Sequence, residues 1–369
     1  MHIAIIGAGI AGSVTAYKLA KAGLQVTVID RFDEGQATDA AAGIVCPWLS
    51  QRRNKDWYQL AKGGARYYPE IIEELRHDGE TETGYARVGA LSLHEDPKKL
   101  DAMLQRAEKR RTDAPEMGKI SRLSENEARQ LFPLLAEGYG AVHVSGAARV
   151  DGRALRNALQ RAARKYDACF VSAEAQLSMK AGRIVVTAGK EEWKPDHVVV
   201  TAGAWAGQLL EPLGYQMQVS FQKAQICHLQ IHTAETHDWP VIIPPNDQYL
   251  LAFPDGRIIA GATHENDEEM DTKITVGGVQ DVLSKALQLA PGLAEASLNE
   301  IRVGFRPFTP GFLPVFGRMP YHSNLYVING LGASGLTTGP FIASQLSKLI
   351  LGQETDIDIS AYNPNGALA

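Results

Sequence analysis

The first thirty residues combine short apolar runs with one stretch of helical periodicity. His2–Ile6 is a run rich in β-branched residues, and the Ala- and Leu-rich segment after it keeps apolar residues at helical spacing as far as Gly23. Gln25–Ile29 is a second β-branched run that ends directly before Asp30. This pattern predicts a strand, a helix and a second strand, in that order.

Apolar residues recur every three to four positions in several later segments, which predicts amphipathic helices. Local signals mark some of their ends: Ser124 and Glu127 form a capping box, Asp151 is a suitable N-cap, and Pro291 ends a helix. The predicted helices are Trp57–Leu75, the charged segment Pro97–Arg111, a short helix that follows Ser124 and stops before Pro133, Gly152–Lys165, Thr275–Ala290 and Thr338–Leu351.

Shorter apolar or alternating runs predict strands. His197–Gly203 is largely apolar and ends in small residues, which is typical of a strand buried on both faces. Pro254-Asp255-Gly256 predicts a turn between two antiparallel strands. The other predicted strands are Arg87–Leu93, Ala168–Val171, Arg183–Thr187, Val219–Ile231, Tyr249–Phe253, Arg257–Ala262, Ile301–Phe305 and Leu325–Ile328.

This order of elements predicts an α/β fold (α+β overall), in which a Rossmann-like domain is interleaved with a domain built on an antiparallel sheet. Because the chain returns to the first domain at its end, neither domain is continuous in sequence. We assign residues 1–83, 146–218 and 306–369 to the Rossmann-like domain and residues 84–145 and 219–305 to the second domain.

A glycine-rich loop joins the first predicted strand to the first helix. Gly7, Gly9 and Gly12 have the GxGxxG spacing, and Asp30 follows Gly12 by 18 residues, at the end of the next strand. The glycines allow a tight turn, close approach of a pyrophosphate and close helix packing, while the acid can bind ribose hydroxyls. The context predicts a dinucleotide site, and the alternative is a βα turn without a ligand.

A second GxGxxG stands near the end of the chain, again between a predicted strand and a helix. Only 34 residues follow Gly335, and no strand ending in an acid comes after the helix. We therefore expect Gly330–Gly335 to meet the far end of the same cofactor rather than a second nucleotide. Ala40–Ile44, a run of small residues, is the next segment within reach of a dinucleotide on the first loop.

Composition narrows the function classes without selecting one. The 369 residues carry a net charge of −5, which argues against nucleic-acid binding. No apolar run is long enough for a membrane span, and no basic signal-peptide region precedes the first strand. Cys46, Cys169 and Cys227 are far apart in the sequence, so we expect no disulfide framework. We expect a cytoplasmic location.

We expect no metal site. His228 and His232 are four residues apart, but in a predicted strand they do not share a helical face. Cys227 and His228 are adjacent in that strand and point to opposite faces, so a thiol–imidazole pair is not expected either.

Several motifs taken together resemble the D-amino-acid oxidase, glycine oxidase and sarcosine oxidase family of FAD enzymes, and the chain looks most like bacterial glycine oxidases. The resemblance covers essentially the whole chain. Besides the first loop, Asp30 and the small residues 41–43, it is carried by Val198–Trp205, Gln248–Thr263, Gly304–Pro307 with Thr309-Pro310, and Gly330–Gly335 with Gly339-Pro340.

The resemblance implies a bound FAD. The tethering cysteine of monomeric sarcosine oxidases lies in the C-terminal region, where this chain has none after Cys227, so a non-covalent cofactor is expected. The residues that would contact it are Gly7, Gly9, Ile10, Ala11, Gly12, Asp30 and Arg31 at the ADP half, Thr38, Ala42, Gly43 and Ile44 beneath the pyrophosphate and flavin, Ala175 near the adenine, Ala202, Gly203 and Trp205 along the central strand, and Gly330, Gly332, Ala333, Ser334, Gly335, Leu336 and Thr337 at the flavin ring.

Three residues are candidates for the substrate site. Arg306 matches the family arginine that holds the substrate carboxylate, a task that suits the two parallel donors of a guanidinium. Tyr249 matches a tyrosine that orients the same carboxylate, and Trp48 is a candidate for the cavity wall. The alternatives are an interdomain salt bridge for Arg306, an ordinary strand aromatic for Tyr249 and core packing for Trp48.

The expected reaction is oxidation of the Cα–N bond of a small amino acid of the glycine, sarcosine or D-amino acid type, by hydride transfer to flavin N5. Glycine oxidases can carry a second arginine in the late glycine loop, where this chain has Ala333. O₂ or another acceptor would reoxidise the flavin, and a homo-oligomer is possible for such an enzyme. The competing hypotheses are an NAD-dependent dehydrogenase that uses only the first loop, and a non-catalytic or tRNA-modifying flavoprotein.

Overall fold

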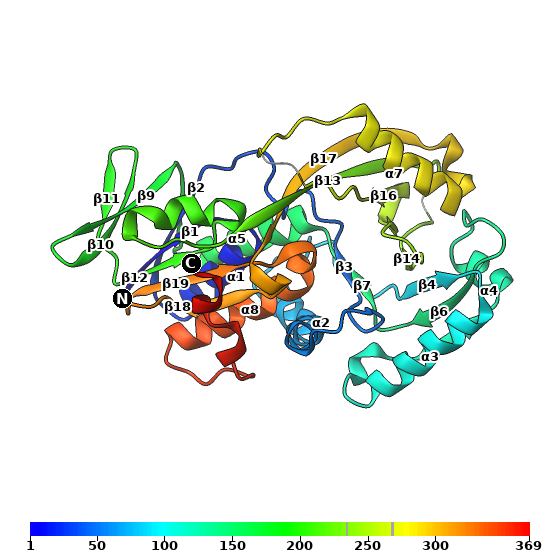
Figure 1. Cartoon of the computed structure of the whole chain (residues 1–369), viewed down its shortest axis with the longest axis horizontal. Helices are drawn as coiled ribbons and strands as arrows, with labels where there is room; N and C mark the ends of the chain where they lie inside the picture. The colour runs from blue at the N-terminus through cyan, green and yellow to red at the C-terminus, as the bar shows by residue number, and fades with distance from the viewer. Residues whose placement is uncertain (234, 267–268) are drawn as a thin grey trace.

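The computed structural model describes residues 1–233, 235–266 and 269–369, and two large sheets organise them. The six-stranded sheet and the eight-stranded sheet occupy opposite ends of an elongated molecule, and the long strands β13 (Ser220–Gln230) and β17 (Ser297–Phe308) extend between the two ends (Figure 1). The two chain termini lie close together beside the six-stranded sheet (Figure 1).

The six-stranded sheet has the order β18–β19–β12–β1–β2–β8 and is parallel apart from the β18–β19 pair. Its inner strands are apolar runs because both faces of the sheet are covered. Its strands are β1 (His2–Ile6), β2 (Gln25–Asp30), β8 (Cys169–Ser172), β12 (His197–Val200), β18 (Val315–Arg318) and β19 (Leu325–Asn329).

The eight-stranded sheet has the order β17–β13–β16–β15–β14–β4–β6–β5 and is antiparallel apart from the β14–β4 pair. Besides β13 and β17 it contains β4 (Ala90–His94), β5 (Ile120–Leu123), β6 (Gly140–Val144), β14 (Val241–Ile243), β15 (Tyr249–Ala252) and β16 (Arg257–Gly261). Two small sheets complete the set, formed by β9 (Ala175–Lys180), β10 (Arg183–Ala188) and β11 (Glu191–Trp193), and by β3 (Ile44–Val45) with β7 (Ala148–Arg149).

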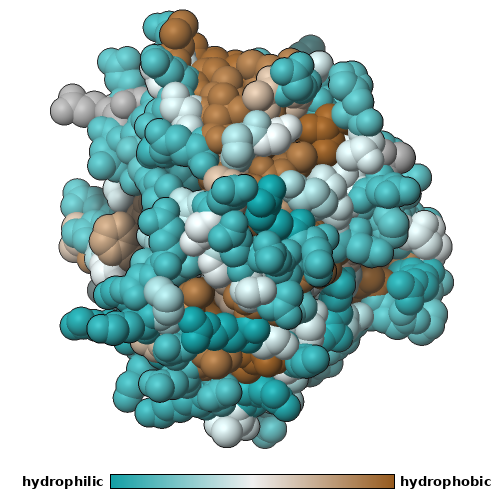
Figure 2. Space-filling view, turned by 90° about the vertical axis from the view of Figure 1, so that its right-hand side faces the viewer, coloured by the Kyte–Doolittle hydropathy of each residue, from teal (hydrophilic) through white to brown (hydrophobic). Residues whose placement is uncertain are grey.

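Eight helices flank the sheets in the described residues. Helix α3 carries many charges and lies at the end of the molecule shown in Figure 2. Most of the surface at that end is hydrophilic, and apolar residues form a patch near the top (Figure 2). The helices are α1 (Ile10–Lys21), α2 (Lys55–His77), α3 (Pro97–Arg111), α4 (Glu125–Leu131), α5 (Gly152–Lys165), α6 (Ala206–Leu210), α7 (Val276–Leu289) and α8 (Gly335–Ile350). None of the helices in the described residues is both long and apolar enough to cross a membrane.

The predicted α/β class is confirmed, and most of the predicted helices agree with the structure within a few residues. The strands β3, β5, β6, β7, β9, β11, β14 and β18 were not predicted, because most are short and several are partly exposed, so they lack a long apolar run. The strands of the six-stranded sheet all lie in the segments predicted for the Rossmann-like domain. Those of the eight-stranded sheet lie in the segments predicted for the second domain, except that β17 continues past residue 305 as far as Phe308. The domain bounds themselves stay a prediction.

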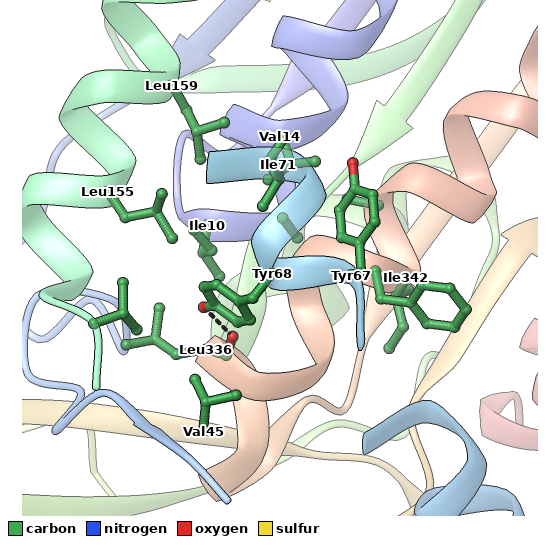
Figure 3. Packing of buried hydrophobic residues seen from close by; sticks show 14 of the residues in the cluster. Ile10, Val14, Val45, Tyr67, Tyr68, Ile71, Leu155, Leu159, Leu336 and Ile342 are labelled. Carbon is green, nitrogen blue, oxygen red and sulfur yellow. Dashed lines mark hydrogen bonds between the residues drawn. The ribbon is translucent and has the colours of Figure 1, made fainter. Parts of the chain in front are cut away.

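The core that supports the first glycine loop is built by four helices. Ile10 and Val14 of α1, Tyr68 of α2, Leu155 of α5 and Leu336 of α8 converge there (Figure 3). Tight packing between α2 and α8 needs glycine, because a Cβ at Gly64 would lie 1.9 Å from the carbonyl oxygen of Thr337.

One hydrogen bond in this core compensates for a proline inside α8. Pro340 has no N–H, so the carbonyl of Leu336, four residues earlier, loses its partner within the helix. The Tyr68 hydroxyl donates to that carbonyl at 2.5 Å (Figure 3). Both residues are almost fully buried, so water cannot replace the tyrosine.

We predict that Tyr68→Phe lowers the free energy of unfolding by about 1–3 kcal/mol, because it leaves a buried carbonyl unsatisfied. Urea unfolding of the FAD-bound protein measures the change. Tyr321→Phe removes a hydroxyl from a side chain that is 95% exposed, and it should change stability by less than about 0.5 kcal/mol. Equal stability of the two variants would contradict the assigned role of Tyr68.

A buried histidine in β13 should make stability depend on pH. Neither ring nitrogen of His228 has a hydrogen-bond partner in the described part of the chain. Burial lowers its pKa to about 4; nearby Arg302 and Arg257 also lower it, while Glu300 and Asp151 act in the opposite direction. The folded protein therefore binds this proton less readily than the unfolded chain does.

Because the folded-state pKa is depressed, stability should fall as the pH drops from about 6.5 towards 4, and this histidine should account for about 3 kcal/mol of the loss. We predict that His228→Gln removes that part of the pH dependence in urea unfolding between pH 7 and pH 4. The control His77→Gln changes an exposed histidine and should leave the dependence intact. An unchanged slope in His228→Gln would refute the prediction.

Candidate active site

The first glycine loop lies where the order of the six-stranded sheet reverses. Strand β1 leads through α1 to β2 on one side, while β12 lies on the other side of β1. Such a point is where open parallel sheets bind ligands, beyond the carboxyl ends of the strands. Gly7 follows β1 here with φ +106°, and a Cβ on it would lie 2.5 Å from the carbonyl oxygen of Thr201. A Cβ at Gly12 would lie 1.9 Å from the Gly7 oxygen, so both positions require glycine.

Polar groups fix the shape of this loop. Asp30 accepts hydrogen bonds from the backbone N–H groups of Ala8 and Phe32, both at 2.5 Å, and from Gln36 at 2.8 Å. Thr38 accepts from the backbone N–H of Ile10 at 3.0 Å, at the first turn of α1. The carboxylate and the helix start therefore border the same end of the sheet, as a nucleotide site requires.

The late glycine loop approaches the eight-stranded sheet. Gly330 and Gly332 have φ of +72° and +54°, which favours glycine. A Cβ at Gly332 would lie 2.4 Å from the ring of Phe308, and one at Gly330 would lie 1.9 Å from Oγ1 of Thr309. Helix α8 begins at Gly335, three residues earlier than predicted, so the end of this loop forms its first turn.

Both glycine loops open into one cavity of about 800 Å³. Its volume lies within the range of cofactor and ligand sites. Of the predicted residues, the cavity is lined by Gly7, Gly9, Ile10, Ala11, Asp30, Arg31, Thr38, Ala42, Gly43, Ile44, Ala175, Ala202, Gly203, Trp205, Tyr249, Arg306, Gly332, Ala333, Gly335, Leu336 and Thr337.

Four predicted residues do not line the cavity. Gly12 and Gly330 shape the loops from behind, and Ser334 accepts a hydrogen bond from the Trp57 indole at 3.2 Å. Trp48 is 1% exposed and belongs to the hydrophobic core, so the structure does not support its predicted place in the cavity wall. From the sequence, a buried tryptophan and a cavity tryptophan look alike.

Arg306 lies near the end of β17 and faces this cavity. It pairs with Gln222 of β13 across the sheet, and its Nη1 lies 3.0 Å from the Gln222 Oε1 and 3.4 Å from the Thr263 carbonyl oxygen. No carboxylate lies within ion-pair distance of Arg306 in residues 1–233, 235–266 and 269–369. Burial lowers the pKa of its guanidinium, and the nearby Tyr249 and Asp247 oppose that effect.

Tyr249 starts β15 and stands opposite Gly261 of β16. A Cβ at Gly261 would lie 2.6 Å from the tyrosine oxygen, so the glycine leaves room for the hydroxyl. Burial raises the pKa of Tyr249 to about 12, although hydrogen bonding to Arg306 lowers it in part. The hydroxyl therefore stays protonated at neutral pH and can donate a hydrogen bond beside the guanidinium.

His264 and Asp247 line the same cavity, and sequence analysis missed both. Nδ1 of His264 lies 3.0 Å from the Arg306 Nη1. Nδ1 also lies 3.0 Å from the Gln222 Oε1, so it has both a donor and an acceptor beside it, while Nε2 lies 4.0 Å from the Asp247 carboxylate. Burial and Arg306 lower the pKa of His264, which favours the neutral imidazole. Neither residue belongs to a sequence motif, so only their proximity to Arg306 reveals them.

The structure also bears on two kinds of chemistry that the sequence did not favour, a thiol nucleophile and a metal site. Burial raises the pKa of the Cys227 thiol to about 11, which disfavours a thiolate nucleophile. Within the described ranges, no cluster of three or more His, Cys, Asp or Glu side chains could hold a metal ion.

Comparisons with known proteins show the family and the fold. Residues 2–349 match the DAO family, described as FAD dependent oxidoreductase. An uncharacterized oxidoreductase, YurR of Bacillus subtilis (strain 168), is 60% identical over 99% of both chains. The crystal structure of iminodiacetate oxidase from Chelativorans sp. BNC1 is 45% identical, with a TM-score of 0.95 over 98% of each chain. A glycine oxidase of Pseudomonas aeruginosa is 28% identical over 100% of this chain and 99% of its own.

The residues present fit FAD. Positions 7, 43 and 332 are glycines at which a Cβ would collide with neighbouring protein atoms, so backbone lies close along the cavity. The first turn of α1 and that of α8 border this one cavity and point partial positive charge towards a ligand. One dinucleotide reaching from Asp30 to Gly332 would use both helix starts.

We predict that Asp30→Ala weakens FAD binding about tenfold or more, because it removes the acceptor that fixes the Ala8 N–H and faces the nucleotide cavity. Fluorescence titration of apoprotein with FAD measures the dissociation constant. Asp33→Ala is the matched control: this acid lines the same cavity but pairs with Arg31 at 2.5 Å, and its loss should change affinity less than about threefold. Equal affinities would contradict the role of Asp30.

Proposed function

Because this chain belongs to the DAO family of FAD-dependent oxidoreductases, whose members act on C–N bonds of amino acids and amines, we propose that it oxidises the Cα–N bond of a small amino acid held by Arg306 and Tyr249. The family match supports FAD as the cofactor and leaves the NAD-dependent alternative without support. We propose the substrate and the roles of the individual residues from the cavity and its contacts.

The observation that carries the proposal is an arginine without an acid partner in the cofactor cavity. Several half-buried arginines of this chain pair with carboxylates, as Arg156 does with Asp39 and Arg302 with Glu300. Arg306 lines the cavity and instead contacts Gln222 and His264, neither of which is a carboxylate. A buried cation needs a compensating anion, and a substrate carboxylate would supply it.

The mechanism assigned to the protein is mainly one of positioning. When bound, FAD supplies two-electron acceptance from the substrate Cα–N bond. Arg306 holds the carboxylate with two parallel hydrogen bonds, and the Tyr249 hydroxyl donates a further one, so the Cα–H bond has a fixed direction. Gln222 and His264 both contact Nη1 of the guanidinium and so help to fix its orientation. Alignment of this kind can contribute roughly 7–11 kcal/mol to lowering the barrier.

We propose a secondary amine that carries carboxylates, of the iminodiacetate type, as the preferred substrate. The 45% identity to iminodiacetate oxidase over nearly the whole chain supports this choice. Ala333 lines the cavity where glycine oxidases can carry a second arginine, which disfavours glycine. Hydrolysis of the resulting imine would release an amine and an aldehyde acid. O₂ or another acceptor would then take the electrons, in a protein that we propose to be cytoplasmic.

We predict that Arg306→Lys slows anaerobic flavin bleaching by iminodiacetate at least about a hundredfold at subsaturating substrate, because lysine keeps the charge but loses the paired donors. Stopped-flow absorbance measures the rate, with sarcosine, glycine and D-alanine as comparison substrates. The flavin content should stay unchanged.

Arg302→Lys is the matched control, since Arg302 lies on the same strand but binds Glu300 at 2.7 Å and does not line the cavity. Iminodiacetate should bleach the flavin of this variant at close to the wild-type rate. Comparable bleaching by Arg306→Lys and by the unmodified enzyme would overturn the role of Arg306. Bleaching by D-alanine or glycine in preference to iminodiacetate would overturn the substrate class alone.

A further inference from the structure

A second, smaller cavity of about 350 Å³ lies outside the cofactor site, where the start of α2 meets α3. Its wall carries five cationic side chains and a tyrosine, and no carboxylate. These residues are Arg52, Arg53, Lys55, Tyr58, Arg106 and Arg110. The FAD site and the substrate site use none of them.

The positive charge of this cavity, which we call the basic pocket, is not neutralised by the protein. None of its five cations forms a salt bridge within the described residues. Of the acids nearby, Asp113 pairs with Lys62 and Glu116 lies 3.5 Å from Arg66, while Asp56 in the first turn of α2 is exposed and does not line the pocket. Because the chain as a whole has a net charge of −5, this group of cations without carboxylate partners makes the pocket locally positive on an acidic protein.

Two buried polar atoms in the pocket also lack partners. Nε of Arg106 and the hydroxyl of Tyr58 are inaccessible to solvent and make no hydrogen bond in the part of the chain that is described. Buried donors are usually satisfied in folded proteins, so these two are unused hydrogen-bonding groups directly beside the pocket. Arg106 comes from α3 and Tyr58 from α2, so the pocket lies between two helices.

The pocket is held in shape without a ligand. Arg110 donates to the carbonyls of Trp48 and Ser50, the latter at 2.7 Å, and its guanidinium lies 4.7 Å from the Tyr58 ring centre. Arg52 donates to the Phe312 carbonyl and lies 4.6 Å from the Trp57 ring centre. These contacts use only part of the donors on each guanidinium and fix the direction of the remaining ones.

We propose that the basic pocket binds a small anion that carries phosphate. Guanidinium groups match phosphate oxygens with paired hydrogen bonds, and the start of the 23-residue helix α2 adds partial positive charge. A diphosphate brings several charges and acceptors at once, which suits five cations better than a single carboxylate does. The volume suits a small molecule rather than a segment of a folded partner.

The test uses FAD-loaded enzyme, in which the glycine loops are already occupied, and titrates it with pyrophosphate at constant ionic strength by calorimetry. We expect saturable binding. The double variant Lys55→Gln, Arg106→Gln should weaken it about tenfold or more, because two cations that line the pocket are removed. Tyr58→Phe should weaken it by a smaller factor.

Lys109→Gln is the matched control, because it removes one cation from an exposed position of the same helix. It should bind pyrophosphate like the wild type. Absence of saturable binding, or equal binding by the double variant and the wild type, would overturn the proposal. Citrate binding as tight as pyrophosphate would overturn the assignment to phosphate. Flavin bleaching by substrate is measured separately, so failure here does not bear on the proposed oxidation.

Discussion

The cofactor end of the molecule depends on one hydrogen bond between two helices, from the Tyr68 hydroxyl to the Leu336 carbonyl. Pro340 removes the helical partner of that carbonyl, and Tyr68 of α2 replaces it in a fully buried position. The bond therefore ties the first turn of α8 to the helix that packs against it. Since Leu336 and Thr337 line the large cavity, this constraint also places the late glycine loop.

Each of the two large sheets contributes different residues to the cavity. The six-stranded sheet presents the first glycine loop and Asp30, whereas the eight-stranded sheet presents Arg306 and Tyr249 from β17 and β15. Neither sheet alone encloses the cavity. The arrangement places a guanidinium without a carboxylate partner at the boundary between them, and in the proposed function this charge would bind the substrate carboxylate.

Sequence similarity and local chemistry support the proposed substrate from different directions. The 45% identity to iminodiacetate oxidase concerns the whole fold, while Ala333 concerns one position in the cavity wall. The basic pocket is independent of both. It lies beside Trp57, whose indole donates to Ser334 in the late glycine loop, so an anion bound there would lie one side chain away from the residues that border the cofactor.

The sequence by itself determined the βαβ unit and the α/β class, because these follow from local spacing: glycines at fixed offsets, an acid after the second strand and apolar runs of strand length. The family and the FAD cofactor followed from the resemblance of several motifs to known FAD enzymes, and the family match confirms both. Only the tertiary structure decided which distant residues share a cavity. Trp48 is buried in the core, while His264 and Asp247 stand beside Arg306, and no local pattern distinguishes these cases. Burial and charge pairing depend on neighbours far away in the chain, and those neighbours are set by packing rather than by spacing.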